Sequence, residues 1–466
     1  MTSSRRTIGT IAVYLGTCMA TIAISIVTVA LPAIQHGLEA DMTGLQWIVG
    51  SYGLCLSAFM LSAGPLGDRY GRKRVWLIGV AIFALGSALA AGAGTLPILI
   101  AGCAIQGVAG ALIIPGALSI LSQAYHDAGQ LSRVIGGWAS VSAVSLILGP
   151  FVGGILVDLF GWFSVFLLNV PLGLAALILG GIGIEESSDP DHAAFDPAGQ
   201  LLSIILLASL TFALTEGGRS GWDTPLALAG FSVTGMSFVA FLTVEARVAQ
   251  PVLPVDLFGD RTFASVNIAS FVLGFMGFSS LFFFSLFLQN AQDLSATQAG
   301  LRMAPIFLSM AIFSSRFGRL SSRFGMIRPM VAGYAAMGVA MLGMTTFEPN
   351  TSYTVLFSLF LLLGIGLGLS VPATSAAIMA ITPRARTGAA AATLNTMRQS
   401  GMTIGIALLG SLMAGASSRA IAMGHGTAKA AAVGFNTAVL WGGVSALAVS
   451  LLLIVGTRQQ DSANND

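Results

Sequence analysis

The sequence has very little charge for its length. Only 9% of its 466 residues are Asp, Glu, Lys or Arg, whereas 55% are hydrophobic and the mean hydropathy is +0.87. Soluble globular chains carry roughly 25% charged residues, so 21 basic and 19 acidic side chains are too few to coat a soluble surface of this size. The composition excludes an ordinary soluble protein and favours a chain dissolved in the lipid bilayer.

The chain also lacks the motifs of enzymes and metalloproteins. Cys18, Cys55 and Cys103 lie in apolar runs without a disulfide framework or metal-ligand spacing, so we interpret them as small packing residues. There is no P-loop, no G-x-S-x-G and no His/Cys cluster, which argues against a membrane enzyme, a signalling protein or an ATP-driven pump. We expect no cofactor, no metal and no nucleic-acid partner.

Long hydrophobic runs fill almost the whole chain. A helix that crosses the bilayer needs about 20 mostly apolar residues. The first run is too long for a signal peptide and has no A-x-A site before Pro32, so we count it as a span. We predict fourteen spanning helices, at 8–32, 44–66, 75–94, 97–124, 132–157, 161–184, 198–217, 225–246, 262–290, 297–316, 329–347, 353–380, 390–416 and 434–456.

Basic residues alternate with these spans as the positive-inside rule requires. With the N-terminus in the cytoplasm, sixteen Lys and Arg fall on inner segments and only four on outer ones, and Arg398 is left inside a span. The pattern predicts an even number of spans with both the N- and the C-terminus cytoplasmic.

One short segment recurs in the two halves of the chain. Residues 64–74 are G-P-L-G-D-R-Y-G-R-K-R and residues 318–328 are G-R-L-S-S-R-F-G-M-I-R, each between the second and third span of its half. Repeated halves are typical of secondary transporters, whose substrate site lies between them near the membrane midplane. We predict a six-helix bundle at 1–184, an acidic linker and two additional spans at 185–261, and a second six-helix bundle with a short cytoplasmic tail at 262–466.

These motifs resemble those of the major facilitator superfamily, in particular its fourteen-helix drug:proton antiporters (EmrB/QacA-like). G-D-R-Y-G-R-K-R at 67–74 is similar to the family signature between spans two and three, and L-G-P-F-V-G-G at 148–154 is similar to its antiporter motif. L-L-N-V-P-L-G at 167–173 and N-T-M-R-Q-S-G at 395–401 extend the resemblance over essentially the whole chain. It implies an all-α polytopic membrane protein with two six-helix bundles plus two central helices. It also implies a monomer in the plasma membrane that exports small molecules by alternating access, with protons as the candidate coupling ion.

Three positions depart from the family pattern. Ala23 stands where the first span normally carries a carboxylate, Cys103 stands at the arginine of R-x-x-Q-G, and Phe163 stands at the arginine of W-R-W. By our segmentation every acidic residue lies in a loop or at a helix end. The candidates for proton coupling are therefore at the edges: Asp41, Asp158, Glu216 and Asp68. Export is better supported than proton coupling, and an uptake carrier or facilitator of the same fold is the alternative.

Residues 67–74 have the composition of a gate. Gly67 and Gly71 permit a tight turn close to a neighbouring helix. Asp68 can accept hydrogen bonds from the exposed N–H groups of a helix N-terminus. The resemblance implies that this helix is span thirteen, which begins near Gly388, and that the contact holds the cytoplasmic side shut.

The arginines of this segment have two candidate roles. Arg69 or Arg72 can pair with Asp127 at the end of span four, which would add an ionic contact to the gate. Alternatively, they only anchor the segment in the cytoplasm, as basic residues next to a span do.

Span five carries the antiporter-motif residues. Gly149, Gly153 and Gly154 lie about one turn apart, and small residues let helices approach closely in lipid. Pro150 removes a backbone hydrogen bond and can kink the helix. We predict that this span is a close-packed rocking element, with ordinary small-residue packing as the alternative.

Arg398 is the one charged residue predicted inside a membrane-spanning helix. Inserting an ionised side chain at the centre of such a helix costs roughly 2.5–3.5 kcal/mol. Arg398 should face the bundle interior, as a substrate or gating contact or bonded to backbone carbonyls. A cavity with this charge and no carboxylate favours neutral or anionic amphipathic substrates over lipophilic cations. The candidate cavity residues are Gln106, Asn169, Gln289, Asn395, Arg398 and Gln399.

Overall fold

The computed structural model describes residues 3–125, 127–188, 196–248, 253, 255–382 and 386–463. Within these ranges the regular structure is helical throughout. Thirteen of the described helices are long and apolar enough to cross a membrane, and the bent pair Met42–Met60 and Ser62–Tyr70 makes a fourteenth. The prediction of an all-α protein with fourteen spans is confirmed over the described part of the chain.

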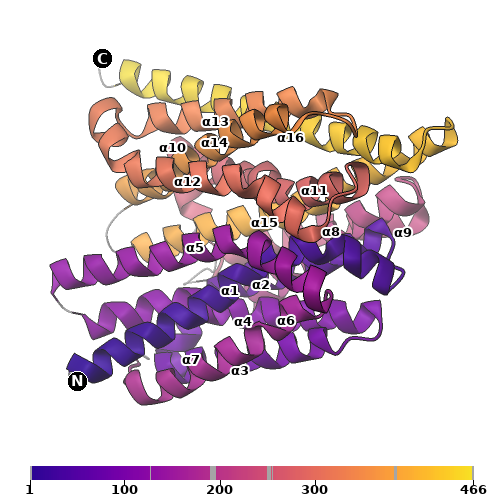
Figure 1. The fold of residues 1–466 in the computed structure, drawn as a ribbon. Helices are drawn as coiled ribbons and strands as arrows, with labels where there is room; N and C mark the ends of the chain where they lie inside the picture. The colour runs from indigo at the N-terminus through magenta and orange to yellow at the C-terminus, as the bar shows by residue number, and fades with distance from the viewer. Residues whose placement is uncertain are drawn as a thin grey trace. The chain divides into compact units, whose positions relative to one another are not determined.

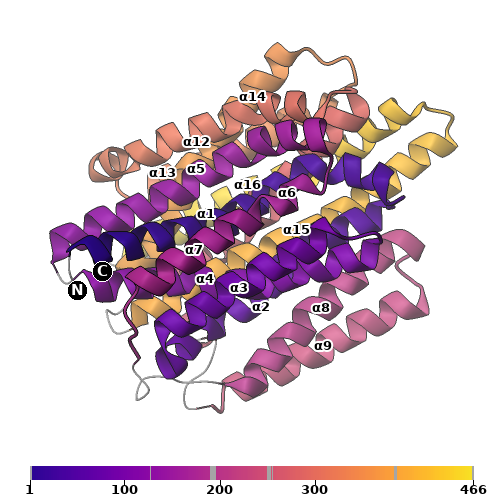
Figure 2. The same cartoon turned by 60° about the horizontal axis from the view of Figure 1, so that its bottom comes forward.

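The internal contacts divide the chain into two compact units. Unit 1 comprises residues 1–207 and 237–252, and unit 2 comprises residues 208–236 and 253–466. The division passes through α8 (Pro197–Ser220) and α9 (Pro225–Glu245), the central helices, which lie side by side in Figure 2. The boundaries that we predicted at residues 184 and 261 stay predictions.

Unit 1 is built mainly from the first seven helices (Figure 1). Within it, α1 packs against α4, α5 and α7, and α4 packs against α2 and α3. Short turns join α3 to α4 and α5 to α6, the second at Gly161 with a φ of 94°. The seven helices are α1 (Ser3–Gly37), α2 (Met42–Tyr70), α3 (Arg72–Ala91), α4 (Leu96–Ala124), α5 (Ala128–Phe160), α6 (Ser164–Leu167) and α7 (Asn169–Gly183).

Helix α2 is bent near its C-terminal end. Its two parts, Met42–Met60 and Ser62–Tyr70, are inclined at 57° to each other. Pro65 lies just beyond the break and has no N–H to bond the carbonyl of Leu61, which is the usual cause of such a kink. The helix continues to Tyr70, four residues beyond the predicted end of the span.

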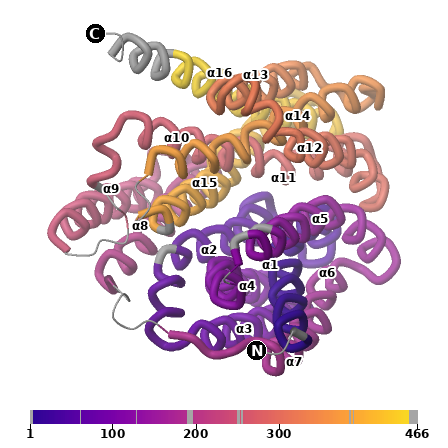
Figure 3. The backbone as a smooth tube through the Cα atoms, turned by 90° about the vertical axis from the view of Figure 1, so that its left-hand side faces the viewer, coloured from indigo at the N-terminus to yellow at the C-terminus, as the bar shows by residue number. Residues whose placement is uncertain are grey.

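Unit 2 contains a helical stretch of mixed type, Arg261–Ala291, in which wide π-helical turns alternate with α-helix. Within this unit, α14 packs against α12 and α13, and α15 packs against α10, η3 and α16 (Figure 3). Its helices are η2 (Val255–Gly259), α10 (Arg261–Val272), η3 (Leu273–Phe278), α11 (Ser280–Leu286), η4 (Phe287–Ala291), α12 (Ala296–Phe324), α13 (Ile327–Gly343), η5 (Met344–Thr346), α14 (Tyr353–Ile381), α15 (Thr387–Ala422) and α16 (Thr427–Ala463).

Candidate functional site

The predicted gate is the last turn of α2 and the single residue that follows it, rather than a loop. Gly67, Asp68 and Arg69 are helical, and Gly71 ends the helix with a φ of 102° and a hydrogen bond from its N–H to the Gly67 carbonyl, 3.0 Å. Helix α3 starts at the next residue, Arg72. A turn of one residue between two helices is possible because glycine tolerates positive φ.

The charged side chains of this gate pair with each other. Arg72 Nε lies 2.7 Å from Asp68 Oδ1, and both side chains are largely buried. The guanidinium of Arg69 stacks over the ring of Tyr70, 5.6 Å from its centroid. Asp127, the partner that we hypothesised for these arginines, instead accepts the N–H of Gln130 at 2.8 Å and caps α5. The expected pairing with Asp127 is therefore replaced by the pair within the gate.

A residue of the acidic linker completes the gate, and the sequence analysis did not single it out. The Glu186 carboxylate accepts the backbone N–H groups of Lys73 at 3.0 Å and Arg74 at 3.1 Å. The N–H of Arg72 donates to the Ser187 carbonyl at 2.9 Å. An anion at a helix N-terminus satisfies its free N–H groups, so Glu186 caps α3 and ties the segment that follows α7 to the gate.

The second copy of the repeat forms the same turn in unit 2. Helix α12 ends at Phe324, and Gly325 follows with a φ of 76° and an N–H bonded to the Ser321 carbonyl, 2.9 Å. Arg323 stacks over the ring of Phe324, 5.2 Å from its centroid. The repeat detected in the sequence is thus also a repeat of backbone geometry and of one cation–π contact.

The antiporter-motif residues of α5 pack directly on α1. A Cβ at Gly149 would lie 3.1 Å from the backbone nitrogen of Ile26 and would overlap Ser25, and a Cβ at Gly153 would lie 3.0 Å from the Ile26 carbonyl. Gly154 and Pro150 are buried too. Pro150 does not interrupt α5, which is one helix from Ala128 to Phe160. The two helices therefore touch backbone to backbone along this stretch.

Nearer the N-terminal ends of α1 and α5, hydrogen bonds join the same two helices. We call the whole line of contact between these helices the α1–α5 seam. The Tyr14 hydroxyl donates to the Val134 carbonyl at 2.7 Å, and Trp138 Nε1 donates to the Thr17 hydroxyl at 2.9 Å. Ala23, at the position of the missing carboxylate, is buried in α1. Along α1 the buried polar side chains are hydroxyls that bond to the preceding turn: Thr17, Thr21, Ser25 and Thr28.

The two candidate cavity residues of unit 1 are buried. Gln106 is 2% exposed and donates through Nε2 to the Ser87 hydroxyl at 2.7 Å, which joins α4 to α3. Asn169 is the first residue of α7, is 1% exposed, and its Oδ1 has no hydrogen-bond partner among the described residues. Gln106 is thus explained by helix packing, whereas Asn169 keeps a free acceptor.

In unit 2 the structure brings Asn395 and Arg398 together. One guanidinium nitrogen of Arg398 donates to Asn395 Oδ1, and Asn395 Nδ2 donates to the Ala391 carbonyl at 3.0 Å. Tyr334 of α13 is fully buried within electrostatic range of Arg398, and its hydroxyl donates to the Ala269 carbonyl at 2.6 Å. Arg398 is half-buried, and the Asn395 amide oxygen solvates its charge through a hydrogen bond.

The other two candidates of unit 2 have local partners. Gln289 lies in the π-helical turn η4, and its Nε2 donates to the Ser285 hydroxyl at 3.0 Å. Gln399 follows Arg398 in the chain, and its side chain is half-buried. Its backbone carbonyl accepts a hydrogen bond from the Thr403 hydroxyl at 3.1 Å. The six candidates divide between the units, and only Asn395 and Arg398 are in direct contact with each other.

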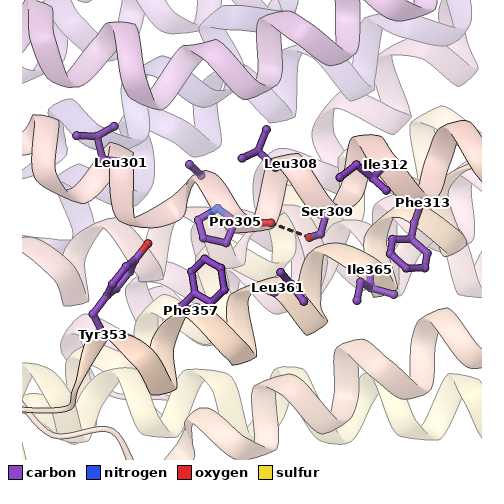
Figure 4. Close-up of a pocket in the computed structure, with 11 residues that line it drawn as sticks. Leu301, Pro305, Leu308, Ser309, Ile312, Phe313, Tyr353, Phe357, Leu361 and Ile365 are labelled. Carbon is purple, nitrogen blue, oxygen red and sulfur yellow. Dashed lines mark hydrogen bonds between the residues drawn. The ribbon is translucent and has the colours of Figure 1, made fainter.

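An apolar groove of about 340 Å³ lies between α12 and α14 in unit 2. Figure 4 shows Leu308 and Ile312 from one helix and Phe357 from the other beside it, with the Ser309 hydroxyl bonded to the Pro305 carbonyl, 2.7 Å. None of the six candidate cavity residues lines this groove. Its walls offer hydrocarbon and aromatic contacts, which suit an apolar group rather than a charged one.

Comparison with known proteins decides the family. Residues 13–406 match the model of the Major Facilitator Superfamily. The chain belongs to this superfamily. Because major facilitators are membrane transporters, the protein is a multi-pass transporter and not an enzyme.

Curated relatives cover most of this major facilitator. The methylenomycin A resistance protein of Bacillus subtilis is 35% identical over 401 residues, which is 86% of each chain. The protein of the same name from Streptomyces coelicolor is 34% identical over 432 residues, 92% of this chain and 90% of that one. The multidrug efflux pump LfrA of Mycolicibacterium smegmatis is 35% identical over 390 residues, 83% of this chain and 77% of that one.

Solved structures support the fold alone. A crystal structure of the peptide transporter POT with sulfate superposes with a TM-score of 0.71 at 14% identity, covering 97% of this chain and 94% of that chain. A structure of the nucleoside transporter NupG gives 0.67 at 14% identity, covering 96% of this chain and 99% of that chain. The helices of this major facilitator are thus arranged as in transporters whose sequences have diverged widely.

Proposed function

We propose that this major facilitator exports antibiotics or other amphipathic small molecules by alternating access, with protons as the coupling ion. The observation that carries the proposal is the similarity, over most of both chains, to proteins named for methylenomycin A resistance and multidrug efflux. An uptake carrier or facilitator of the same fold is the alternative, and the loss of a carboxylate at Ala23 is the observation in its favour.

The gate and the α1–α5 seam supply the moving parts of this cycle. Helices in backbone contact move as one body, because a relative shift of either would create a clash or a void. Asp68 sits at the end of a bent helix, and the family resemblance implies that it contacts the start of span thirteen, near Gly388, in one state of the cycle. In this proposal the gate closes the cytoplasmic side in one state and releases it in the other.

The setting of the transporter follows from the same resemblance and from the charge pattern. We place it as a monomer in a bacterial plasma membrane with both termini in the cytoplasm, because sixteen basic residues then face inward and four outward. Cysteines introduced at residues 68 and 322 should then react with an impermeant reagent only in everted vesicles.

The charge of Arg398 bears on the substrate. It is the charged member of the candidate cavity, and one of its guanidinium nitrogens donates to Asn395 Oδ1. We expect neutral or anionic amphipathic compounds to be preferred over lipophilic cations. Efficient export of an organic cation with no export of neutral or anionic compounds would contradict this preference.

Everted membrane vesicles with an acidic lumen test the export proposal. An antiporter moves protons out of the lumen and the compound in, so methylenomycin A and other amphipathic antibiotics should accumulate and should leak out when a protonophore is added. Vesicles without the protein are the control. A facilitator would only equilibrate the compounds, and an uptake carrier would accumulate them in right-side-out vesicles instead.

A further inference from the structure

The apolar groove between α12 and α14 is about as long as one leaflet of a membrane is deep. Its lining residues extend from Leu301 to Phe313 on α12 and from Tyr353 to Ile365 on α14. On either helix this is a rise of about 18 Å, whereas the hydrocarbon core of a whole bilayer is about 30 Å thick. A single lipid chain could therefore lie along the groove over its full length.

The groove is a fixed part of unit 2, because its two walls touch backbone to backbone. A Cβ at Gly368 of α14 would lie 2.6 Å from the Met310 carbonyl oxygen of α12, and a Cβ at Gly364 would overlap the Ile306 carbonyl. Helices that meet this closely keep their separation. The groove is thus preformed, as binding sites for small molecules usually are.

The walls of the groove are apolar and yet exposed. Leu308 is 55% exposed, Ile312 46% and Phe357 43%. The polar side chain beside them, Ser309, already donates its hydroxyl to the Pro305 carbonyl at 2.7 Å (Figure 4). Sites for drug-sized ligands carry a few polar groups that orient the ligand, and this part of the groove offers none. Such walls suit a plain hydrocarbon chain.

One end of the groove carries a positive charge. Tyr353 lines that end beside Leu301 (Figure 4), and the Arg302 guanidinium lies over the Tyr353 ring, 5.2 Å from its centroid. Tyrosine is enriched at the level of the lipid headgroups, and arginine near a helix end extends its charge to the same level. The charged end of the groove therefore has the composition of a membrane–water interface.

The turns before α12 and α14 hold this arginine in place. Arg302 Nη1 donates to Gln292 Oε1 at 2.9 Å, and Gln292 Nε2 donates to the Thr351 carbonyl at 3.1 Å. A guanidinium has five N–H donors, and Gln292 takes one of them among the described residues. The carboxylates of these turns, Asp293 and Glu348, are exposed, and within the described ranges neither forms an ion pair with Arg302. The charge is thus fixed in position and keeps donors for an anion.

We propose that this groove binds an anionic phospholipid, with one acyl chain along its walls and the headgroup phosphate at Arg302. Arginine binds phosphate through two parallel N–H···O hydrogen bonds. A headgroup without a positive charge of its own complements the arginine better than a zwitterionic headgroup does. The charge at one end and the hydrocarbon walls beyond it match the two parts of one lipid molecule. The site depends neither on the direction of transport nor on the coupling ion.

Photocrosslinking of a lipid to the purified protein tests the position of the chain. The reagent is phosphatidylglycerol with a diazirine in the middle of one acyl chain, and mass spectrometry of the peptides locates the adducts. We expect adducts at residues 301–313 and 353–365. Leu308→Trp should remove most of them, because the larger side chain fills the groove. Leu451→Trp, at an exposed leucine of α16, is the matched control and should keep them. Adducts that are unaffected by Leu308→Trp overturn the groove as the site.

Competition between lipids tests the charge. Unlabelled phosphatidylglycerol should displace the reagent at a concentration about tenfold lower than phosphatidylcholine, since hydrogen bonds to charged groups are the stronger ones. Arg302→Gln should remove this difference, whereas Arg302→Lys, which keeps the charge, should retain part of it. Arg419→Gln, which removes an exposed arginine near the end of α15, should retain all of it. Equal displacement by the two lipids in wild type contradicts the proposal.

The same assay separates the lipid from two other ligands. Inorganic phosphate should not displace the reagent, because it has no chain for the groove; displacement by phosphate would indicate a simple anion site and overturn the proposal. Methylenomycin A should also leave the adducts unchanged. Displacement by this compound would assign the groove to the exported molecule and would equally overturn the lipid site.

Discussion

In unit 1, α2 ends at Gly71, and in unit 2, α12 ends at Gly325. Both glycines have positive φ, 102° and 76°, and each N–H bonds to the carbonyl four residues earlier. The side chains differ: the first copy holds the Asp68–Arg72 pair, whereas Ser322 and Met326 occupy those positions in the second. One residue separates the helices in the first copy and two, Gly325 and Met326, separate them in the second, and the Asp68–Arg72 pair is present in the first copy only.

The surroundings of the two turns differ in the same way. A Cβ at Gly71 would lie 2.7 Å from the Glu186 carboxylate, whereas a Cβ at Gly325 would meet nothing within 4 Å. The turn of unit 1 is thus packed and charged, and the turn of unit 2 is open. The comparison indicates that the backbone turn is structural, and we propose that the gating role belongs to the charged side chains found only at the turn of unit 1.

The strongest test of this comparison removes the charge from one copy. Asp68→Asn should lower export about ten- to a hundredfold, because hydrogen bonds to a charged group contribute about 1.5–3 kcal/mol. Vesicle accumulation measures the effect at equal expression. Ser322→Asn places the same side chain at the matching position of the other copy and should leave export within about twofold of wild type. Equal losses in the two variants would mean that the copies do not differ in role.

Both units also contain helices that approach each other closely at a glycine, so whole helices can be compared in the same way. In unit 2 a Cβ at Gly401 would overlap the carbonyl of Phe271, much as Gly149 meets α1 in unit 1. Gly149→Ala and Gly401→Ala should each lower stability by about 1–3 kcal/mol through overpacking, seen as a lower unfolding temperature in detergent. Gly136→Ala, on α5 but with open space around it, should be neutral. A neutral Gly149→Ala would show that the seam is looser than described.

Alanine substitution at Gly71 and at Gly325 tests whether the first turn is more tightly packed than the second. Both substitutions place a Cβ at positive φ and should destabilise. Gly71→Ala should cost about 1 kcal/mol more than Gly325→Ala, because the added carbon also displaces the Glu186 cap. Unfolding temperatures of the two variants, measured side by side, give the difference. The reverse order would count against the cap.

The smallest expected effect comes from Glu186 itself. Glu186→Gln keeps one acceptor oxygen but loses its charge at the α3 N-terminus, which should cost about 0.3–1 kcal/mol. The unfolding temperature should fall slightly, and less so in high salt. Glu348→Gln, an exposed carboxylate in unit 2, is the control. A loss that does not respond to salt would indicate a packing role instead.

The sequence was sufficient for the spans, the repeat and the family, because these depend on composition and on short local patterns. It placed the gate in a loop, since nothing local shows that α2 continues past Pro65 to Tyr70. It assigned Asp127 to an arginine because it could not show that this carboxylate caps its own helix.

The Glu186 carboxylate was missed for a related reason. It was interpreted as part of a polar linker. Its capping of α3 depends on residues far apart in the chain. Such a contact is set by tertiary packing, so neither charge nor periodicity in the sequence reveals it.

The π-helical turns of unit 2 have a consequence for the side chains that follow them. A π turn holds one residue more than an α turn, and one residue corresponds to about 100° of rotation around a helix axis. The turn at Leu273–Phe278 therefore advances the phase of Ser280–Leu286, a segment in which every residue is buried. Deleting one residue from that turn would restore the ordinary period and swing three consecutive phenylalanines, Phe282, Phe283 and Phe284, out of register with their present neighbours.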